Sequence, residues 1–176
     1  MDLEEEETKA VGWIQEAFDL AESIGKISKD QHSILDFLLE FEWGPRMTRT
    51  IGMAETGDSL IRIKLSSVLW PLCSEEEKRK TAFHEAAHII VIVVDGADAP
   101  PHGREWLSLM SSLGYEDPEI YHHIVSPEVE RRRGNQPVYC DCDDSPHTWV
   151  TPRRKSKIMG TGVRCKRCRA PVRFRP

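Results

Sequence analysis

Two histidines and a glutamate stand close together in the segment His84-Glu85-Ala86-Ala87-His88. Residues four positions apart lie on the same face of an α-helix, with Cβ atoms about 5–6 Å apart. If this segment is helical, both imidazoles can bind one zinc ion, and Glu85 can reach a water molecule on that ion. The spacing therefore predicts a zinc site that activates water. Surface histidines on an amphipathic helix are the alternative.

A zinc site that activates water commonly has three protein ligands and one open position. His102 follows His88 by fourteen residues, after a loop that contains prolines and before a helical segment. This arrangement can fold the ring of His102 back onto the first helix. The other candidates for the third ligand are His122, His123 and His147.

Four of the five cysteines form two close pairs, Cys140 with Cys142 and Cys165 with Cys168. Four thiolates can hold one structural zinc ion in a tetrahedron and stabilise short hairpins that have little apolar surface. We therefore expect a four-cysteine zinc site, in which His147 could replace one thiolate. Two disulfides, or unpaired cysteines in a disordered tail, are the alternatives.

Charge is divided unevenly along the chain. The first 144 residues hold 14 Lys or Arg and 29 Asp or Glu, a net charge of −15, whereas residues 145–176 hold ten Lys or Arg and no acid. A basic segment with interleaved aromatics, here Trp149 and Phe174, can bind phosphates and stack on unpaired bases. We predict salt-sensitive, sequence-tolerant contacts with nucleic acid, and a solvated basic surface is the alternative. The predicted contact residues are Arg153, Arg154, Lys155, Lys157, Lys166, Arg167 and Arg169.

Apolar residues at helical spacing predict the helices that would position these side chains. They recur over about residues 8–24 and 28–41. A long helix is predicted over residues 74–94 and a short one over 104–113. The segments that open the second and third helices, Ser28-Lys-Asp-Gln31 and Ser74-Glu-Glu-Glu77, have the form of capping boxes. The histidine motif thus falls inside a well-capped helix.

Residues 46–65 have the pattern of a β-hairpin, because Ile61, Ile63 and Leu65 alternate with basic residues after a turn sequence. Residues 116–137 are interrupted by Pro118 and Pro127 and contain an arginine run, and they are interpreted as a connection between two modules. The sequence therefore predicts an α+β protein with a second, cysteine-bearing module.

The two histidine motifs, His84-Glu-Ala-Ala-His88 and Pro101-His-Gly-Arg-Glu-Trp106, resemble the SprT-like family of zinc metallopeptidases. That family includes bacterial SprT proteins and the eukaryotic protease Spartan. The resemblance covers about residues 30–172. It extends to the hairpin segments Arg49 to Gly52 and Ile63 to Ser66, and to Tyr139-Cys-x-Cys142, His147, Arg153-Arg154 and Cys165-x-x-Cys168, which resemble the zinc ribbon of bacterial members.

The resemblance implies a zincin-like metallopeptidase domain over residues 1–125 and a basic zinc ribbon over residues 136–176. It implies that His84, His88 and His102 bind a catalytic zinc ion and that Glu85 is the general base. It also implies that the substrates are proteins bound or crosslinked to DNA. The alternative is a non-enzymatic nucleic-acid-binding or regulatory zinc protein with an idle or structural histidine site.

The sequence has no apolar run that could span a membrane. Its longest strictly apolar run, Ile89 to Val94, has six residues, and a span needs about 20. The acidic N-terminus, Met-Asp-Leu-Glu-Glu-Glu-Glu, lacks the features of a secretory signal. We expect a cytoplasmic protein that associates with DNA through its basic module and does not associate with a membrane.

Overall fold

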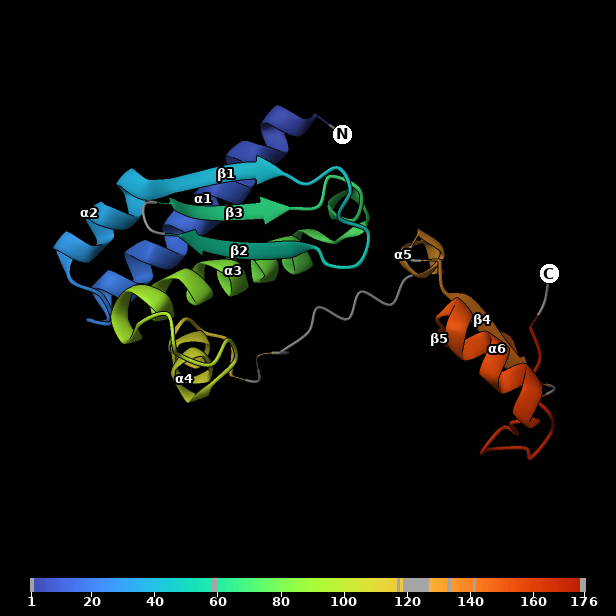
Figure 1. Cartoon of the computed structure of the whole chain (residues 1–176). Coiled ribbons are helices and arrows are strands. Elements are labelled where there is room, and N and C mark those ends of the chain that lie inside the picture. Colours follow the sequence, from blue (N-terminus) through green and yellow to red (C-terminus); the bar gives the residue numbers. More distant parts are fainter. Residues whose placement is uncertain are drawn as a thin grey trace. The chain divides into compact units, whose positions relative to one another are not determined.

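The computed structural model describes residues 2–57, 60–116, 118, 127–132, 134–140 and 142–174. The chain divides into two units, residues 1–123 and 124–176, and each is described by itself (Figure 1). Both units combine helices with a small sheet, so the predicted mixture of helices and strands is confirmed.

Three helices of the first unit begin at side-chain caps. Helix α1 (Leu3–Ser23) begins at Asp2, whose side chain accepts a hydrogen bond from the backbone N–H of Glu4. Helices α2 (Lys29–Leu38) and α3 (Glu75–Asp95) begin at Ser28 and Ser74, and both have the predicted capping box. In each box the serine and the residue three positions later satisfy two backbone N–H groups that would otherwise lack a partner.

The sheet of the first unit has three strands in the order β1-β3-β2. Strands β2 (Gly52–Gly57) and β3 (Leu60–Leu65) pair antiparallel, which confirms the predicted hairpin, although its first strand begins later than residue 46. Strand β1 (Leu39–Trp43) pairs parallel with β3. Strand β2 is therefore an edge strand, and α3 packs against it.

The prediction of a helix over residues 28–41 is wrong beyond Leu38, because Leu39–Trp43 forms strand β1. Leu39, Phe41 and Trp43 alternate with glutamates along this segment, and the glutamates are exposed. A segment of five residues is too short for its apolar spacing to distinguish a strand from a helix, and pairing with β3 determines that it is a strand.

Helices α1 and α3 lie behind one face of the sheet in the view of Figure 1, and α2 lies at one end. Strand β3 sends Ile61, Ile63 and Leu65 toward the core, where they are buried. Its other face carries Arg62 and Lys64, which form ion pairs with neighbouring strands. Their partners are Glu40, Glu42 and Glu55. Strands β1 and β3 thus each have one apolar and one charged face.

A buried ion pair joins α1 to α3. The Nζ atom of Lys78 donates to Oε2 of Glu6 at 2.7 Å, and Nε1 of Trp70 donates to the same oxygen at 2.8 Å. Burial alone would raise the pKa of Glu6, but these two hydrogen bonds, together with the positive charges of Lys78 and Lys9, hold the pKa below its ordinary value. Trp70 belongs to a short 3-10 helix (Trp70–Leu72) that precedes α3.

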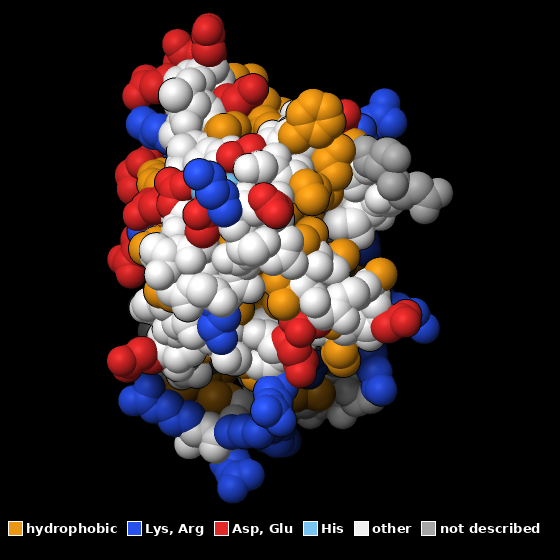
Figure 2. All heavy atoms as spheres, turned by 90° about the vertical axis from the view of Figure 1, so that its left-hand side faces the viewer, with side chains coloured by type: hydrophobic (Ala, Val, Ile, Leu, Met, Phe, Trp, Pro, Cys, Tyr) orange, Lys and Arg blue, Asp and Glu red, His pale blue; other side chains and the backbone are white. Residues whose placement is uncertain are grey.

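The face that carries α2 shows hydrophobic side chains among acidic ones (Figure 2). On this helix Phe37 is 87% exposed and Ile34 is 50% exposed, whereas Leu35 is fully buried. Leu35 is therefore the residue through which α2 enters the core.

The second unit has a two-stranded antiparallel sheet, β4 (Gln136–Cys140) and β5 (Asp143–Val150). Tyr139 of β4 also forms an isolated bridge with Arg173 near the end of the chain. Two short helices, α5 (Pro127–Arg132) and α6 (Pro152–Thr161), were not predicted. Helix α6 begins at Thr151, whose hydroxyl accepts from the N–H of Arg154, and Pro152 stands in its first turn. Among the described residues, no helix is long and apolar enough to cross a membrane.

Candidate functional site

Helix α3 carries His84, Glu85 and His88 at its centre. His84 and Glu85 are buried, each with 4% of its surface exposed, and His88 is half-buried. The imidazoles of His84 and His88 lie on one face of the helix, with ring centroids 4.9 Å apart. This is the pairing that four-residue spacing produces on a helix.

A turn-rich loop returns His102 to the same place. Gly96 ends α3 with φ of 93°, a conformation that favours glycine, and the N–H of Ala99 donates to its carbonyl oxygen. The N–H of Gly103 donates to the carbonyl of Pro100 in a second turn, and helix α4 (Arg104–Ser112) follows. Two successive turns thus direct His102 back toward α3.

The three histidines meet at one point. The ring of His102 lies 5.0 Å from that of His84 and 4.6 Å from that of His88, centroid to centroid. One ring nitrogen of each residue lies within 4.8 Å of the others, and the Nε2 atoms of His84 and His102 are 3.0 Å apart. Zinc–nitrogen bonds of about 2.0–2.1 Å place the nitrogens of a tetrahedral site about 3.3 Å apart. The donor set therefore fits a zinc-type metal ion.

Trp106 contacts all three imidazoles. Its ring centroid lies 4.6 Å from His84, 5.6 Å from His88 and 4.8 Å from His102, and the residue is fully buried. Its ring is stacked on His88 and edge-on to His102. Trp106 is the first apolar residue of α4 and directly follows the loop that carries His102. Its contacts with His84 and His88 therefore hold this loop against α3.

The carboxylate of Glu85 lies against the backbone of edge strand β2. A Cβ atom on Gly52 would lie 2.6 Å from Oε1 of Glu85 and 2.7 Å from its Cγ, so no larger residue fits there without a shift. Glu85 and the three histidines line a cleft of about 500 Å³ between β2, α3 and the loop before α4. The cleft is large enough to admit a segment of a peptide chain.

The second unit brings together its four paired cysteines. All four Sγ atoms lie within 4.8 Å of one another. The distances include 2.8 Å from Cys140 to Cys142, 4.0 Å from Cys142 to Cys165 and 3.5 Å from Cys168 to Cys140. Zinc–sulfur bonds of about 2.3 Å place tetrahedral thiolates about 3.8 Å apart. This group is a candidate metal site of closed, four-ligand type.

Two backbone N–H groups donate hydrogen bonds to the sulfur of Cys165. Hydrogen bonds from the backbone of Cys168 and Arg167 lower the pKa of Cys165 to about 6. The N–H of Arg167 lies 3.4 Å from its sulfur. Such donors stabilise the thiolate, which is the form that binds metal.

The sequence of this chain is similar to that of a known protein family. The model of the SprT-like family matches residues 18–125, which is more than half of the chain. Protein SprT of Pseudomonas syringae pathovar tomato is 32% identical over 124 residues, which is 70% of this chain and 73% of that protein. Protein SprT of Pseudomonas putida is 31% identical over 120 residues, 68% of this chain and 70% of that protein.

The chain belongs to the SprT-like family. The resemblance of the two histidine motifs to this family is thereby confirmed. The matched residues include all three histidines and Glu85, and they end before the four cysteines.

In this SprT-like chain the structure brings together His84, His88 and His102. Of the other candidates for the third position, His122 and His123 lie outside the described residues, and so does the side chain of His147. Two residues of the site were missed by sequence reasoning. Trp106 entered the sequence analysis only as the last residue of the second histidine motif, and Gly52 only as part of the hairpin.

The SprT-like chain exposes several of its predicted basic contact residues. Arg153 and Arg154 lie on α6, and neither side chain makes a hydrogen bond or ion pair with a described residue. Lys155 is half-buried, with Nζ 5.1 Å from the centre of the Phe174 ring. Lys157, also on α6, is exposed, and so are Lys166, Arg167 and Arg169 beyond that helix.

Proposed function

We propose that this protein is a zinc-dependent metallopeptidase with a zincin-like domain over residues 1–125. The observation that carries the proposal is the convergence of three imidazoles beside a buried carboxylate in an open cleft. Zinc peptidases use this donor set with a glutamate as general base. Membership in the SprT-like family supports the same reading.

His84, His88 and His102 would hold the ion, which would supply an acidified water molecule and polarise the peptide carbonyl. Glu85 would accept a proton from the attacking water on its carboxylate and return it to the leaving amine nitrogen. Gly52 lets that carboxylate lie against β2, and Trp106 holds the three rings in place. Neutral imidazoles leave the positive charge of the ion undiminished.

We propose that residues 136–176 form a zinc ribbon in which Cys140, Cys142, Cys165 and Cys168 hold a structural ion. Four thiolates leave no open position for a substrate, so this site would stabilise the fold of the unit. A reducing cytoplasm would keep the thiols available to metal, and we place the protein there.

We further propose that this basic ribbon binds DNA and that the substrates are proteins bound or crosslinked to DNA. The support is the absence of acids after Asp144 and the exposure of Arg153, Arg154, Lys166 and Arg167. Phosphate contacts of this kind are insensitive to sequence and weaken as salt rises.

Glu85→Gln tests the peptidase proposal. The variant should keep its fold and two zinc ions per chain but lose cleavage of a protein substrate, because the amide cannot accept the proton. Cleavage at the wild-type rate would remove Glu85 from the mechanism. A fourth protein ligand at the histidine site, or no metal there, would instead favour the non-enzymatic nucleic-acid-binding or regulatory zinc protein.

A charge-removal variant tests recruitment to DNA. Replacing Arg153, Arg154, Lys166 and Arg167 with Gln should weaken DNA binding and flatten its salt dependence. The slope of log K against log salt should fall by about 0.9 for each lost contact with duplex DNA. Cleavage of a short peptide should remain, whereas any stimulation by DNA should be lost. Equal loss of both activities would refute recruitment.

A further inference from the structure

The cleft beside Glu85 has two ends of different chemistry. One end follows the second half of α3 and the loop after it, and its lining is apolar. These residues are Val91, Ile92, Ala97, Ala99, Pro100 and Pro101. The other end lies at the start of β2 and is lined by Arg49 and Thr50. Among the described residues that line the cleft, Arg49 is the one with a lysine or arginine side chain.

Arg49 lies on a loop, residues 44–51, that is anchored on both sides of it. Buried Ser66 donates from Oγ to the carbonyl oxygen of Met47 at 2.5 Å. The backbone N–H of Ser66 donates to the carbonyl oxygen of Ile51 at 2.7 Å, and Ile51 is fully buried. Because these anchors bracket Arg49 closely, its backbone has a defined place at the end of the cleft.

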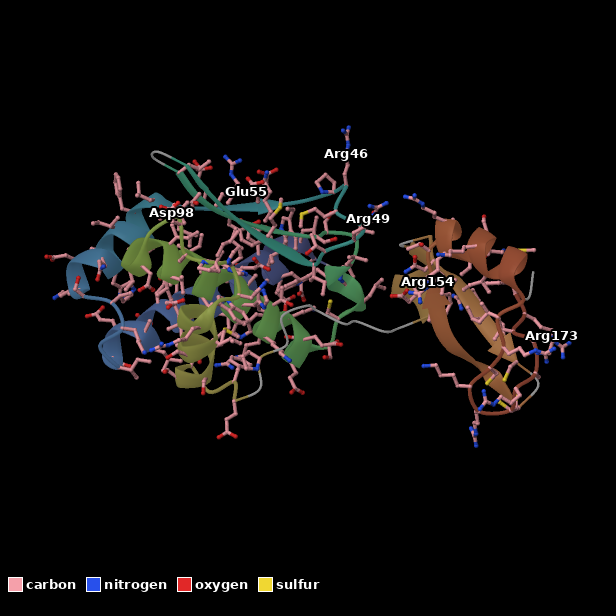
Figure 3. The ribbon with its side chains drawn as sticks, turned by 60° about the horizontal axis from the view of Figure 1, so that its bottom comes forward. Arg46, Arg49, Glu55, Asp98, Arg154 and Arg173 are labelled. Atoms are coloured by element: carbon pink, nitrogen blue, oxygen red, sulfur yellow. The ribbon has the colours of Figure 1, made fainter. Side chains whose placement is uncertain are left out.

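The guanidinium of Arg49 is available to a ligand. The residue is exposed, and its side chain makes no hydrogen bond or ion pair with any described residue. By contrast, Arg62 on the outer face of the sheet already pairs with Glu40 at 2.7 Å. Arg46, on the same loop, is also exposed and unpaired among the described residues, but it does not line the cleft. Figure 3 shows the side chains of Arg46 and Arg49 leaving the loop in different directions.

We infer that Arg49 is a specificity-determining residue that binds an acidic side chain of the substrate. That side chain would lie at the end of the cleft where β2 begins, on the side of the cleaved bond nearer to Glu85. A guanidinium accommodates a carboxylate through two parallel N–H···O bonds, which a glutamine or lysine side chain cannot reproduce. The apolar end of the cleft has no comparable charge and accommodates small or apolar side chains. This inference rests on the proposed peptidase function.

The experiment uses otherwise identical fluorogenic peptides that carry Glu, Gln or Lys at successive positions on both sides of the cleaved bond. The wild-type protein should prefer Glu to Gln at one position by about fivefold in kcat/KM, the effect of about 1 kcal/mol from a partly exposed pair. Arg49→Gln should remove this preference, and Arg49→Glu should reverse it in favour of Lys. Arg46→Gln is the matched control and should retain it.

Two results would overturn the inference while leaving the peptidase proposal intact. One is a wild-type protein that cleaves the peptides without a Glu preference at any position, and the other is an Arg49→Gln variant that keeps the preference. If the wild-type protein cleaves none of them, the peptidase proposal fails. Titration of the wild-type protein and Arg49→Gln with the same labelled peptides then still tests Arg49 through binding alone. Equal affinities for the Glu and Gln peptides would refute it.

Discussion

Gly52 and Glu85 are in contact at the wall of the cleft, where the carboxylate of Glu85 lies against the backbone of Gly52. An added Cβ at position 52 would meet Oε1 of Glu85 at 2.6 Å and Cδ at 2.9 Å. Glu85 is 4% exposed, so its side chain has little space into which it can retreat. The start of the edge strand therefore determines where the proposed general base lies.

Gly52→Ala should lower kcat by about 100-fold, because a displacement of about 1 Å at a reacting group has effects of this size. Zinc content should stay at the wild-type value, since the three atoms nearest to a Cβ at position 52 all belong to Glu85 and not to a histidine. Gly57→Ala, at the other end of β2, is the control, because a Cβ there meets nothing within 4 Å. Equal kcat values for the two variants would show that the contact does not position Glu85.

Trp106→Phe should weaken metal binding at the histidine site. The smaller ring cannot maintain the contacts that Trp106 makes with all three imidazoles, and loss of such support typically lowers metal affinity by about 10- to 100-fold. Competition with a chromophoric chelator measures the effect. Trp13→Phe serves as the control, since Trp13 packs on Trp70. Unchanged affinity in Trp106→Phe would mean that the loop alone holds His102.

Zinc stoichiometry separates the two candidate metal sites. The wild-type protein should bind two ions, and His102→Ala and Cys165→Ser should each bind one. Cys165→Ser should also unfold the second unit, because its short strands and helices depend on the metal. Limited proteolysis followed by mass spectrometry would show which unit is lost. Two ions in His102→Ala would require a different third ligand.

The ion pair of Glu6 and Lys78 should make the free energy of unfolding depend on pH in the acidic range. The pKa of Glu6 is lowered in the folded protein, so its ionised form stabilises the fold above pH 4.5, the ordinary value. That contribution is lost as the pH falls from there through the lowered pKa. Glu6→Gln should cost about 3 kcal/mol at pH 7, because Lys78 is left in a buried place without its main partner.

Urea unfolding at pH 7 and below pH 4.5 measures this effect. Glu75→Gln is the matched control, because Glu75 pairs with the same Lys78 at 3.0 Å while its side chain is 61% exposed. An exposed pair of this kind contributes about 0.2–1 kcal/mol. If both variants lose the same stability, the buried position of Glu6 has no special role.

Local sequence predicted the parts of this protein that depend on near neighbours. The capping boxes at Ser28 and Ser74 and the hairpin of β2 and β3 are confirmed, because each is formed by residues only a few positions apart. Strand β1 and helix α6 were missed. The first is decided by pairing with β3, which is distant in sequence, and the second by a cap at Thr151 in a segment without clear apolar periodicity.

The candidate site likewise combines features set by neighbouring residues with features set by contacts between distant segments. The placement of His84, Glu85 and His88 in one region of a helix follows from their spacing alone, since helical geometry places residues four apart on one face. Three further features depend on how distant segments pack together: His102 joins the other two histidines, Trp106 contacts all three rings, and Gly52 leaves room for the carboxylate of Glu85. These contacts join segments separated by loops and strands, and close packing between elements determines them.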